Sequence, residues 1–145
     1  MMIKSHMSIF SQMSHSPSSF PWIITAMIFR MLQVMAAILR DPNDTTQISL
    51  LYANQSEEDI LVRDMLEELS QKNPDRLKLW FTVDRHSKGW KYSSGFITDQ
   101  MIADHLPPPS DDTLVLMCGP PPMVKFACIE NLDKLGYAKS SQVAF

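Results

Sequence analysis

The chain has 145 residues, room for one domain with a buried core, and its 45% hydrophobic and 20% charged residues are typical of an ordinary globular protein. Its formal charge of −3 gives no general attraction to phosphate backbones, so we expect no nucleic-acid partner. The two cysteines, Cys118 and Cys128, lack C-x-x-C spacing, and the four histidines are scattered. This pattern argues against a metal site and against a disulfide framework, and it suits a reducing compartment.

The first 30 residues differ in composition from the rest of the chain. Seven of the eleven methionines lie before residue 36, and residues 1–19 are rich in Ser and Met without a clear period. We expect a disordered leader there. The apolar segment at residues 20–39 has the length of a bilayer span, but Arg30 lies inside it, and a central arginine costs roughly 2.5–3.5 kcal/mol on insertion. We favour a buried helix at residues 31–39 over a membrane segment.

Strands and helices alternate after residue 47. Nearly continuous apolar runs predict buried strands at residues 48–53, 77–83 and 114–118. Helical spacing predicts a helix that begins at Ser56 and ends before Pro74, and a short helix that Thr98 caps. We expect a last helix after the three prolines, with four residues facing inward: Met123, Phe126, Ala127 and Leu132. This order predicts an α/β fold with a parallel sheet, in which ligands bind at the carboxyl ends of the strands.

The first of these strand ends is Ala53-Asn54-Gln55-Ser56. A turn that leads directly into a helix N-terminus offers free N–H groups to an anion, and the two amides can bond sugar or phosphate oxygens. The alternative is a simple capped turn, and this feature alone favours that alternative.

The second strand end is Val83-Asp84-Arg85. A carboxylate at this place can accept both hydroxyls of an adenosine ribose and repels a 2′-phosphate, which favours NADH over NADPH. The adjacent Arg85 weakens this inference. A solvated pair of loop residues is an equally good interpretation of the spacing.

The third strand end is Cys118-Gly119-Pro120-Pro121-Pro122-Met123. Gly119 lets a ligand approach the backbone closely, and the prolines stiffen the turn. A thiol here can touch a nicotinamide ring without acting as a nucleophile. The alternative is a buried structural cysteine beside a stiff turn. Phe96 and Phe145 can offer ring faces to an adenine or a flavin, although a single aromatic residue is more often part of the core.

Together these segments resemble the NADH-cytochrome b5 reductases, a family of ferredoxin-reductase-like flavoproteins. The resemblance covers roughly the last 115 residues, in order and at the right spacing, and the run CGPPPM is close to diagnostic. The matching stretches are MLQVMAAILRDPNDTT (31–46), LLYANQSEEDILVRDMLEEL (50–69), LKLWFTVDR (77–85), GWKYSSGFIT (89–98), DHLPPP (104–109), LVLMCGPPPM (114–123) and NLDKLGY (131–137).

The resemblance implies a doubly wound NAD-binding domain that follows a flavin domain in the family. NADH gives a hydride to FAD, which passes single electrons to cytochrome b5. The resemblance assigns the ribose and pyrophosphate to Ala53, Asn54 and Gln55, the adenosine ribose to Asp84, and the surroundings of the adenine to Phe96. It assigns the positioning of the nicotinamide to residues 118–123, with Cys118 as the catalytic contact, and the neighbourhood of the flavin to Phe145.

The chain departs from the family pattern at two places. No R-x-Y-[ST] flavin-domain motif stands before residue 31, so we expect no flavin barrel. The family's loop GGTGITP precedes MLQV, but an ungapped reading finds residues 24–30 there, without glycine. We therefore expect an altered first strand at residues 22–26 and no phosphate-cradling loop. The predicted division is a leader at 1–30 and a nucleotide-binding domain at 31–145, which by itself binds NADH weakly or not at all and does not bind FAD.

Three functions remain open from the sequence. The first is a cytochrome b5 reductase by descent, in a truncated form that is inactive alone. The second is a non-enzymatic nucleotide-binding or protein-interaction module that pairs with a separate flavin domain. The third is a membrane-tethered form. We expect a cytoplasmic protein, with the cytosolic face of a membrane as the alternative.

Overall fold

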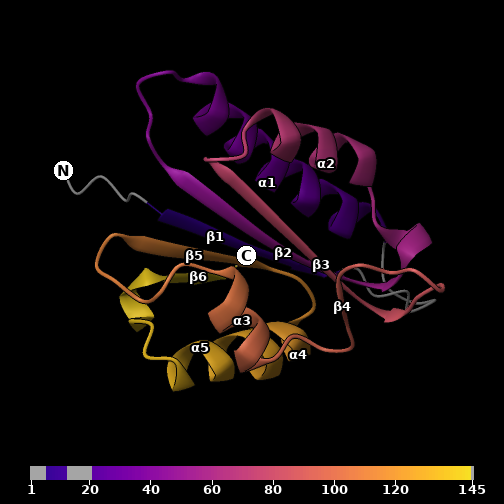
Figure 1. The fold of residues 1–145 in the computed structure, drawn as a ribbon. Coiled ribbons are helices and arrows are strands. Elements are labelled where there is room, and N and C mark those ends of the chain that lie inside the picture. Colours follow the sequence, from indigo (N-terminus) through magenta and orange to yellow (C-terminus); the bar gives the residue numbers. More distant parts are fainter. Residues whose placement is uncertain (1–5, 13–20, 145) are drawn as a thin grey trace.

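A computed structural model describes residues 6–12 and 21–144, with side chains from residue 28 onward. Six strands form one parallel sheet in the order β4-β3-β2-β1-β5-β6 (Figure 1). The strands are β1 (His6–Gln12), β2 (Gln47–Ser56), β3 (Leu77–Arg85), β4 (Ser93–Ser94), β5 (Thr113–Cys118) and β6 (Gln142–Ala144). The parallel α/β fold expected from the sequence is confirmed.

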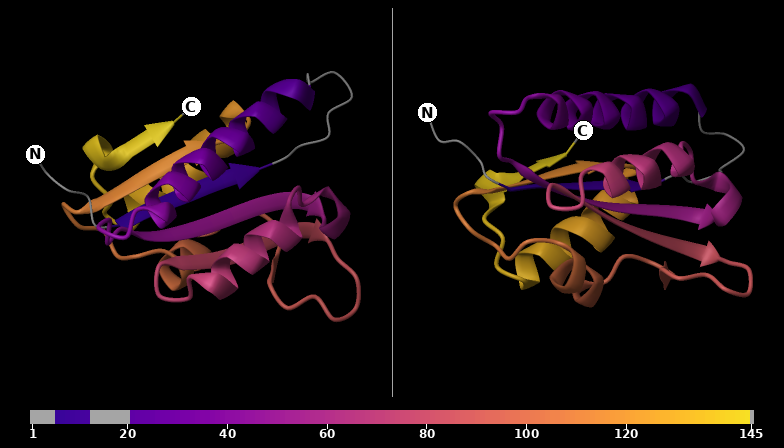
Figure 2. Two further views of the ribbon diagram at one scale, coloured as in Figure 1. Left: turned by 90° about the horizontal axis from the view of Figure 1, so that it is seen from above. Right: turned by 45° about the horizontal axis from the view of Figure 1, so that its top comes forward.

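Helices cover both faces of this sheet. The helices are α1 (Pro21–Arg40), α2 (Arg63–Lys72), α3 (Asp99–His105), α4 (Pro121–Met123) and α5 (Glu130–Lys134), with a π-helical segment (Val124–Ile129) between α4 and α5. Figures 1 and 2 show α1 and α2 on one face and α3, α4 and α5 on the other. The arrangement is therefore the doubly wound one that the alternation of strands and helices predicts.

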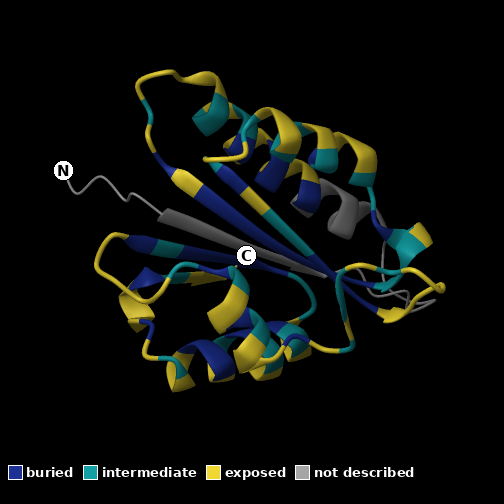
Figure 3. Ribbon diagram, viewed as in Figure 1, coloured by how far each residue is buried: buried dark blue, intermediate teal, exposed yellow. Residues whose placement is uncertain are grey.

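Each face of the sheet has its own core, because successive side chains of a strand point to opposite faces. Leu50 and Tyr52 of β2 pack under α1 and α2, whereas Leu51 and Ala53 pack against the α3–α5 layer. Strands β2 and β5 therefore contain mostly buried residues, as Figure 3 shows. The buried strands predicted at 48–53, 77–83 and 114–118 are confirmed, although Lys78 of β3 is exposed.

The N-terminal part of the chain differs from its prediction. Residues 6–12, expected to be disordered, form β1 between β2 and β5, and the strand expected at residues 22–26 lies inside α1. The alternation in β1 is short and weak, and pairing with two distant strands supplies support that a local pattern does not reveal. Residues 1–5 and 13–20 lie outside the described part of the chain.

Helix α1 runs unbroken from Pro21 to Arg40, across residue 30. Its 20 residues extend about 30 Å, close to the roughly 33 Å of the ten-residue β2, so one helix covers the length of the sheet. Ile28, Met31 and Met35 are buried at spacings of three and four and fix its inner face. Across the helices that the structure describes, none is long and apolar enough to cross a membrane.

Helix α2 begins later than the sequence predicts. Ser56 still belongs to β2, and a single 3-10 turn (Glu57–Asp59) follows it. The carboxylate of Asp59 accepts hydrogen bonds from the Ser56 backbone N–H at 3.1 Å and from its hydroxyl at 2.7 Å. The chain then passes through Val62 with a φ of 55°, a left-handed conformation that a β-branched residue rarely adopts, before α2 starts. The start signal at Ser56 therefore makes a tight turn and not the long helix.

Candidate nucleotide-binding site

The carboxyl ends of the strands meet at one edge of the sheet, because all the strands are parallel. Ser11 of β1 stands opposite Tyr52 of β2 on one side and opposite Cys118 of β5 on the other. With strands roughly 4.8 Å apart, the backbones of Tyr52 and Cys118 lie about 10 Å from each other. The first and third predicted strand ends are thus brought together across β1.

Asn54 is a buried polar side chain without a partner. It lies two residues after Tyr52 in β2 and is 2% exposed, and neither atom of its amide has a hydrogen-bond partner in the described part of the chain. Leaving such a group unpaired costs roughly 1–3 kcal/mol. An unpaired buried amide at the carboxyl end of β2 is a candidate contact for a ligand oxygen.

The two neighbours of Asn54 have other surroundings. Ala53 points into the core against α3–α5, and Gln55 is half-buried. Both belong to β2, and Ser56 leads into a single capped 3-10 turn, which agrees with the simple capped turn that the sequence favoured over an anion site at residues 53–56. A single 3-10 turn carries too few free N–H groups for that role.

Asp84 lies near the carboxyl end of β3 and is exposed, as a ribose-binding carboxylate must be. The loop after it is held by Glu57, which accepts hydrogen bonds from the backbone N–H and the hydroxyl of Ser87, each at 2.7 Å. Arg63 lies 3.5 Å from the same carboxylate. The hydrogen bond from the Ser87 hydroxyl is the main cause that holds the pKa of Glu57 below its ordinary value. The carboxylate of Glu57, which follows β2, therefore connects the end of β2 to the loop after β3.

Cys118 is the last residue of β5 and is 2% exposed. Burial raises the pKa of its thiol, so the sulfur stays protonated near neutral pH and is a poor nucleophile. Pro120 and Pro121 open α4, where a missing N–H costs nothing, and the Val124 N–H donates to the Pro120 carbonyl at 3.1 Å. The helix start predicted at the three prolines is confirmed.

An apolar groove of about 440 Å³ lies beside this turn. It brings Phe96 together with Pro120, Pro122 and Met123, although the family resemblance assigns Phe96 to the adenine and residues 118–123 to the nicotinamide. Asn54, Asp84 and Cys118 lie outside the groove. The remaining lining residues are Ile97, Phe126 and Ala127. The predicted Phe145 lies outside the described residues.

Phe126 was expected to face inward and is instead 57% exposed. The reason is the π-helix: its wider turn changes which side chains face the sheet, and Val124 and Cys128 are the buried ones. The Cys128 thiol contacts the Met123 sulfur at 3.2 Å, five residues away, and burial raises the pKa of Cys128 to about 12. No sequence signal distinguished a π-helix from an α-helix here, so this groove residue was missed.

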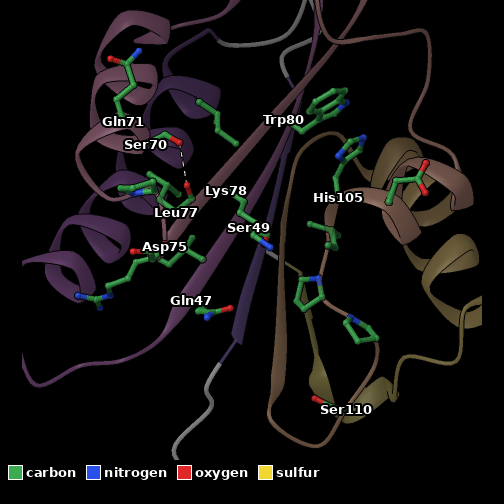
Figure 4. A pocket seen from close by; sticks show the side chains of 18 residues that line it. Gln47, Ser49, Ser70, Gln71, Asp75, Leu77, Lys78, Trp80, His105 and Ser110 are labelled. Atoms are coloured by element: carbon green, nitrogen blue, oxygen red, sulfur yellow. Dashed lines mark hydrogen bonds between the residues drawn. The ribbon is translucent and has the colours of Figure 1, made fainter.

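A second and larger groove, about 820 Å³, lies toward the amino ends of β2 and β3 (Figure 4). In it, the ring of His105 stacks on Trp80 at 3.7 Å, and the Ser70 hydroxyl donates to the Leu77 carbonyl at 3.0 Å. These contacts hold α2 and α3 to the sheet. The groove is at the wrong end of a parallel sheet for a ligand site.

Residues 28–129 match the family model described as an oxidoreductase NAD-binding domain. NADH-cytochrome b5 reductase 2 of Xenopus laevis is 56% identical over 115 residues, which are 79% of this chain and 39% of that protein. NADH-cytochrome b5 reductase 1 of Homo sapiens is also 56% identical over 115 residues, 79% of this chain and 38% of that protein. The chain thus spans less than half the length of these relatives.

A solved structure extends the similarity to the N-terminal part. The cytochrome b5 reductase domain of Ulva prolifera nitrate reductase superposes with a TM-score of 0.85 and 43% identity, over 99% of this chain and 50% of that one. Because nearly the whole chain is covered, β1 and α1 belong to the matched fold. The similarity therefore begins before residue 31, where the sequence motifs begin.

Proposed function

Because the chain belongs to the family of oxidoreductase NAD-binding domains, we propose that it binds NADH and presents the nicotinamide to a flavin held by another domain or chain. The observation that carries the proposal is the orphaned amide of Asn54 at the carboxyl end of β2. Burying an amide without partners costs free energy unless a ligand oxygen pairs with it. The relatives' names supply the cofactor, and the exposed Asp84 supplies a second polar contact.

In this proposal each part of the site has one task. Asn54 and Gln55 bond the ribose and pyrophosphate, Asp84 accepts the hydroxyls of the adenosine ribose, and the residues from Cys118 to Met123 hold the nicotinamide. Cys118 acts by contact, because its buried, protonated thiol packs against a ring without attacking it. Such positioning is a large part of how a protein promotes hydride transfer.

The complete reaction needs partners that these residues do not provide. When bound, a flavin takes the hydride as an electron pair and releases electrons singly. We propose FAD as that flavin and cytochrome b5 as the final acceptor, from the names of the relatives and the family resemblance. The chain by itself is then inactive as a reductase, and pairing with a flavin domain restores the electron path.

The affinity for NADH is expected to be low. The segment between β1 and α1, residues 13–20, contains no glycine, and a close backbone approach to a pyrophosphate favours glycine. Contacts to the adenosine and nicotinamide ends of NADH then supply most of the binding free energy. We expect a dissociation constant well above roughly 1 µM, the value that corresponds to about 8 kcal/mol.

Calorimetric titration of the purified chain with NADH tests the proposal, with FAD titrated in parallel. We expect weak, saturable binding of NADH and none of FAD, and the variant Asn54→Ala should lose most of the NADH signal. Absence of NADH binding at millimolar concentration contradicts the proposal. Stoichiometric FAD in the purified chain contradicts the assignment of the flavin to another domain.

A further inference from the structure

A single side chain holds the ends of β2 and β3 together beyond their last backbone pair. That last pair joins Ser56 to Arg85. Beyond it the two strands diverge, because Glu57 enters a 3-10 turn and residues 86–92 form the loop after β3. Asp84 lies one residue before the last pair. Strand ends open more readily than strand centres, so the position of Asp84 depends on what keeps this end closed.

The carboxylate of Glu57 keeps this end closed. One of its oxygens, Oε1, accepts hydrogen bonds from both the backbone N–H and the hydroxyl of Ser87, which stands two residues after Arg85. Hydrogen bonds to an ionised acceptor are roughly twice as strong as those between neutral groups. Glu57 thus continues the connection between the two strands where their backbone ladder stops.

The carboxylate of Glu57 is itself held in place by Arg63. Its second oxygen, Oε2, lies 3.5 Å from Nη1 of Arg63, whose Nε donates to Glu67 at 3.2 Å. The guanidinium of Arg63 also lies 5.2 Å from the ring centre of Trp90, near the end of the same loop. Val62, directly before Arg63, has the left-handed φ of 55°, and such strain persists only where surrounding contacts enforce it. The two oxygens of Glu57 are therefore engaged on opposite sides, one by the loop and one by a fixed cation.

We propose that Glu57 is a positioning residue that fixes the carboxylate of Asp84, and thereby the preference of the site for NADH over NADPH. This inference rests on the proposed function and deepens it. The carboxylate that accepts the ribose hydroxyls of NADH repels the 2′-phosphate of NADPH, and this repulsion falls as the distance between the charges grows. A loosened strand end therefore binds NADH less tightly and rejects NADPH less strongly. Glu57 acts through Asp84 and does not itself contact the nucleotide.

The test compares NADH with NADPH on the full chain and on three variants. Glu57→Ala removes the contact with Ser87, whereas Glu57→Gln keeps an acceptor oxygen for it. The control, Glu68→Ala, removes an exposed carboxylate that pairs with Lys72 within α2. Calorimetric titration gives the ratio of the two affinities, which a general loss of stability does not change because it weakens both nucleotides alike.

Glu57→Ala should lower the NADH-to-NADPH affinity ratio about fivefold, the size of the effect that loss of one hydrogen bond produces. Glu57→Gln should retain most of the ratio, and Glu68→Ala should leave it unchanged. Amide hydrogen exchange, followed by NMR without any nucleotide, should become faster at Ser87 in Glu57→Ala and stay unchanged in Glu68→Ala.

The contrary outcomes are separable. Unchanged exchange at Ser87 in Glu57→Ala overturns the hold of Glu57 on the loop. Faster exchange with an unchanged affinity ratio overturns the positioning role and leaves the proposed function intact, and so does equal weakening of both nucleotides. If Glu57→Gln loses the preference as fully as Glu57→Ala, the charge of Glu57 sets the preference and the positioning role is wrong. If the wild-type chain binds neither nucleotide at millimolar concentration, the proposed function fails and this inference fails with it.

Discussion

The first 30 residues and the rest of the chain build one sheet, but they carry different amounts of the family's sequence. From residue 31 onward the motifs, the strand ends and the CGPPPM turn follow the reductases closely. Before residue 31, strand β1 and the first turns of α1 still belong to a fold that matches a reductase domain over 99% of the chain. The segment between them contains no glycine. The N-terminal part thus retains the scaffold and lacks the motif.

A strand that only completes the sheet and a loop that binds phosphate therefore require different kinds of sequence. A central strand needs only enough apolar character to pair on both sides, and many sequences meet that need. A backbone cradle for a pyrophosphate needs residues that accept positive φ and close approach, and few do.

The largest effect is expected from a proline in β1. Ser11 pairs with Tyr52 on one side and Cys118 on the other, so Ser11→Pro removes a donor at the centre of the sheet. We expect a loss of 3 kcal/mol or more in the free energy of unfolding, measured by urea denaturation. Ser11→Ala keeps the N–H and should be nearly neutral. Equal stability of the two variants would show that β1 is dispensable.

The second effect concerns the missing loop. Replacement of residues 14–20 by GGTGITP should raise the affinity for NADH about tenfold or more, because glycines allow backbone N–H groups to approach the pyrophosphate. Calorimetry measures the change. A matched control replaces the same residues with seven serines and should not gain affinity. If both grafts bind alike, the lack of glycine does not explain weak binding.

Asn54 should show opposite effects on stability and on binding. Asn54→Leu removes an unpaired buried amide and should raise the free energy of unfolding by about 1 kcal/mol while it abolishes NADH binding. The control is Asn131→Leu, which removes a buried amide that donates to Ala127 at 2.8 Å and should be destabilising by a similar amount. Destabilisation by Asn54→Leu would show that this amide is paired in the folded chain.

The smallest effect is a pH dependence that arises outside the site. Burial against Trp80 lowers the pKa of His105 below its ordinary value near 6.5, so protonation is less favourable in the folded chain than in the unfolded one. The contribution of His105 to stability is complete above about pH 6.5 and is lost as the pH falls through the lower folded pKa. Urea denaturation at pH 7.0 and 5.5 should show this decline, and His105→Phe, which keeps the stack, should remove it. If the free energy of unfolding of His105→Phe falls as much between pH 7.0 and 5.5 as that of the wild type, groups other than His105 cause the decline.

Most of the fold beyond residue 47 could be predicted from the sequence, because apolar runs and helical spacing there agree with the tertiary contacts. Strand β1 could not, since its pattern is short and its pairing partners lie far along the chain. The start of α2 was misassigned because Ser56 and its acids form a tight turn equally well. Among the site residues, Phe126 was missed because only coordinates reveal the π-helical register that turns it outward.

The central position of β1 also has a consequence for how the chain reaches its native state. On the ribosome β1 is made before all the other described strands, yet its partner β5 is about a hundred residues later. The sheet cannot close until translation is nearly complete, and parallel pairing of such high contact order is slow. During that interval the edge of β1 that pairs with β5 is open to other chains. Expression yield should therefore depend on chaperones that shield nascent strands more than on the stability of the finished domain.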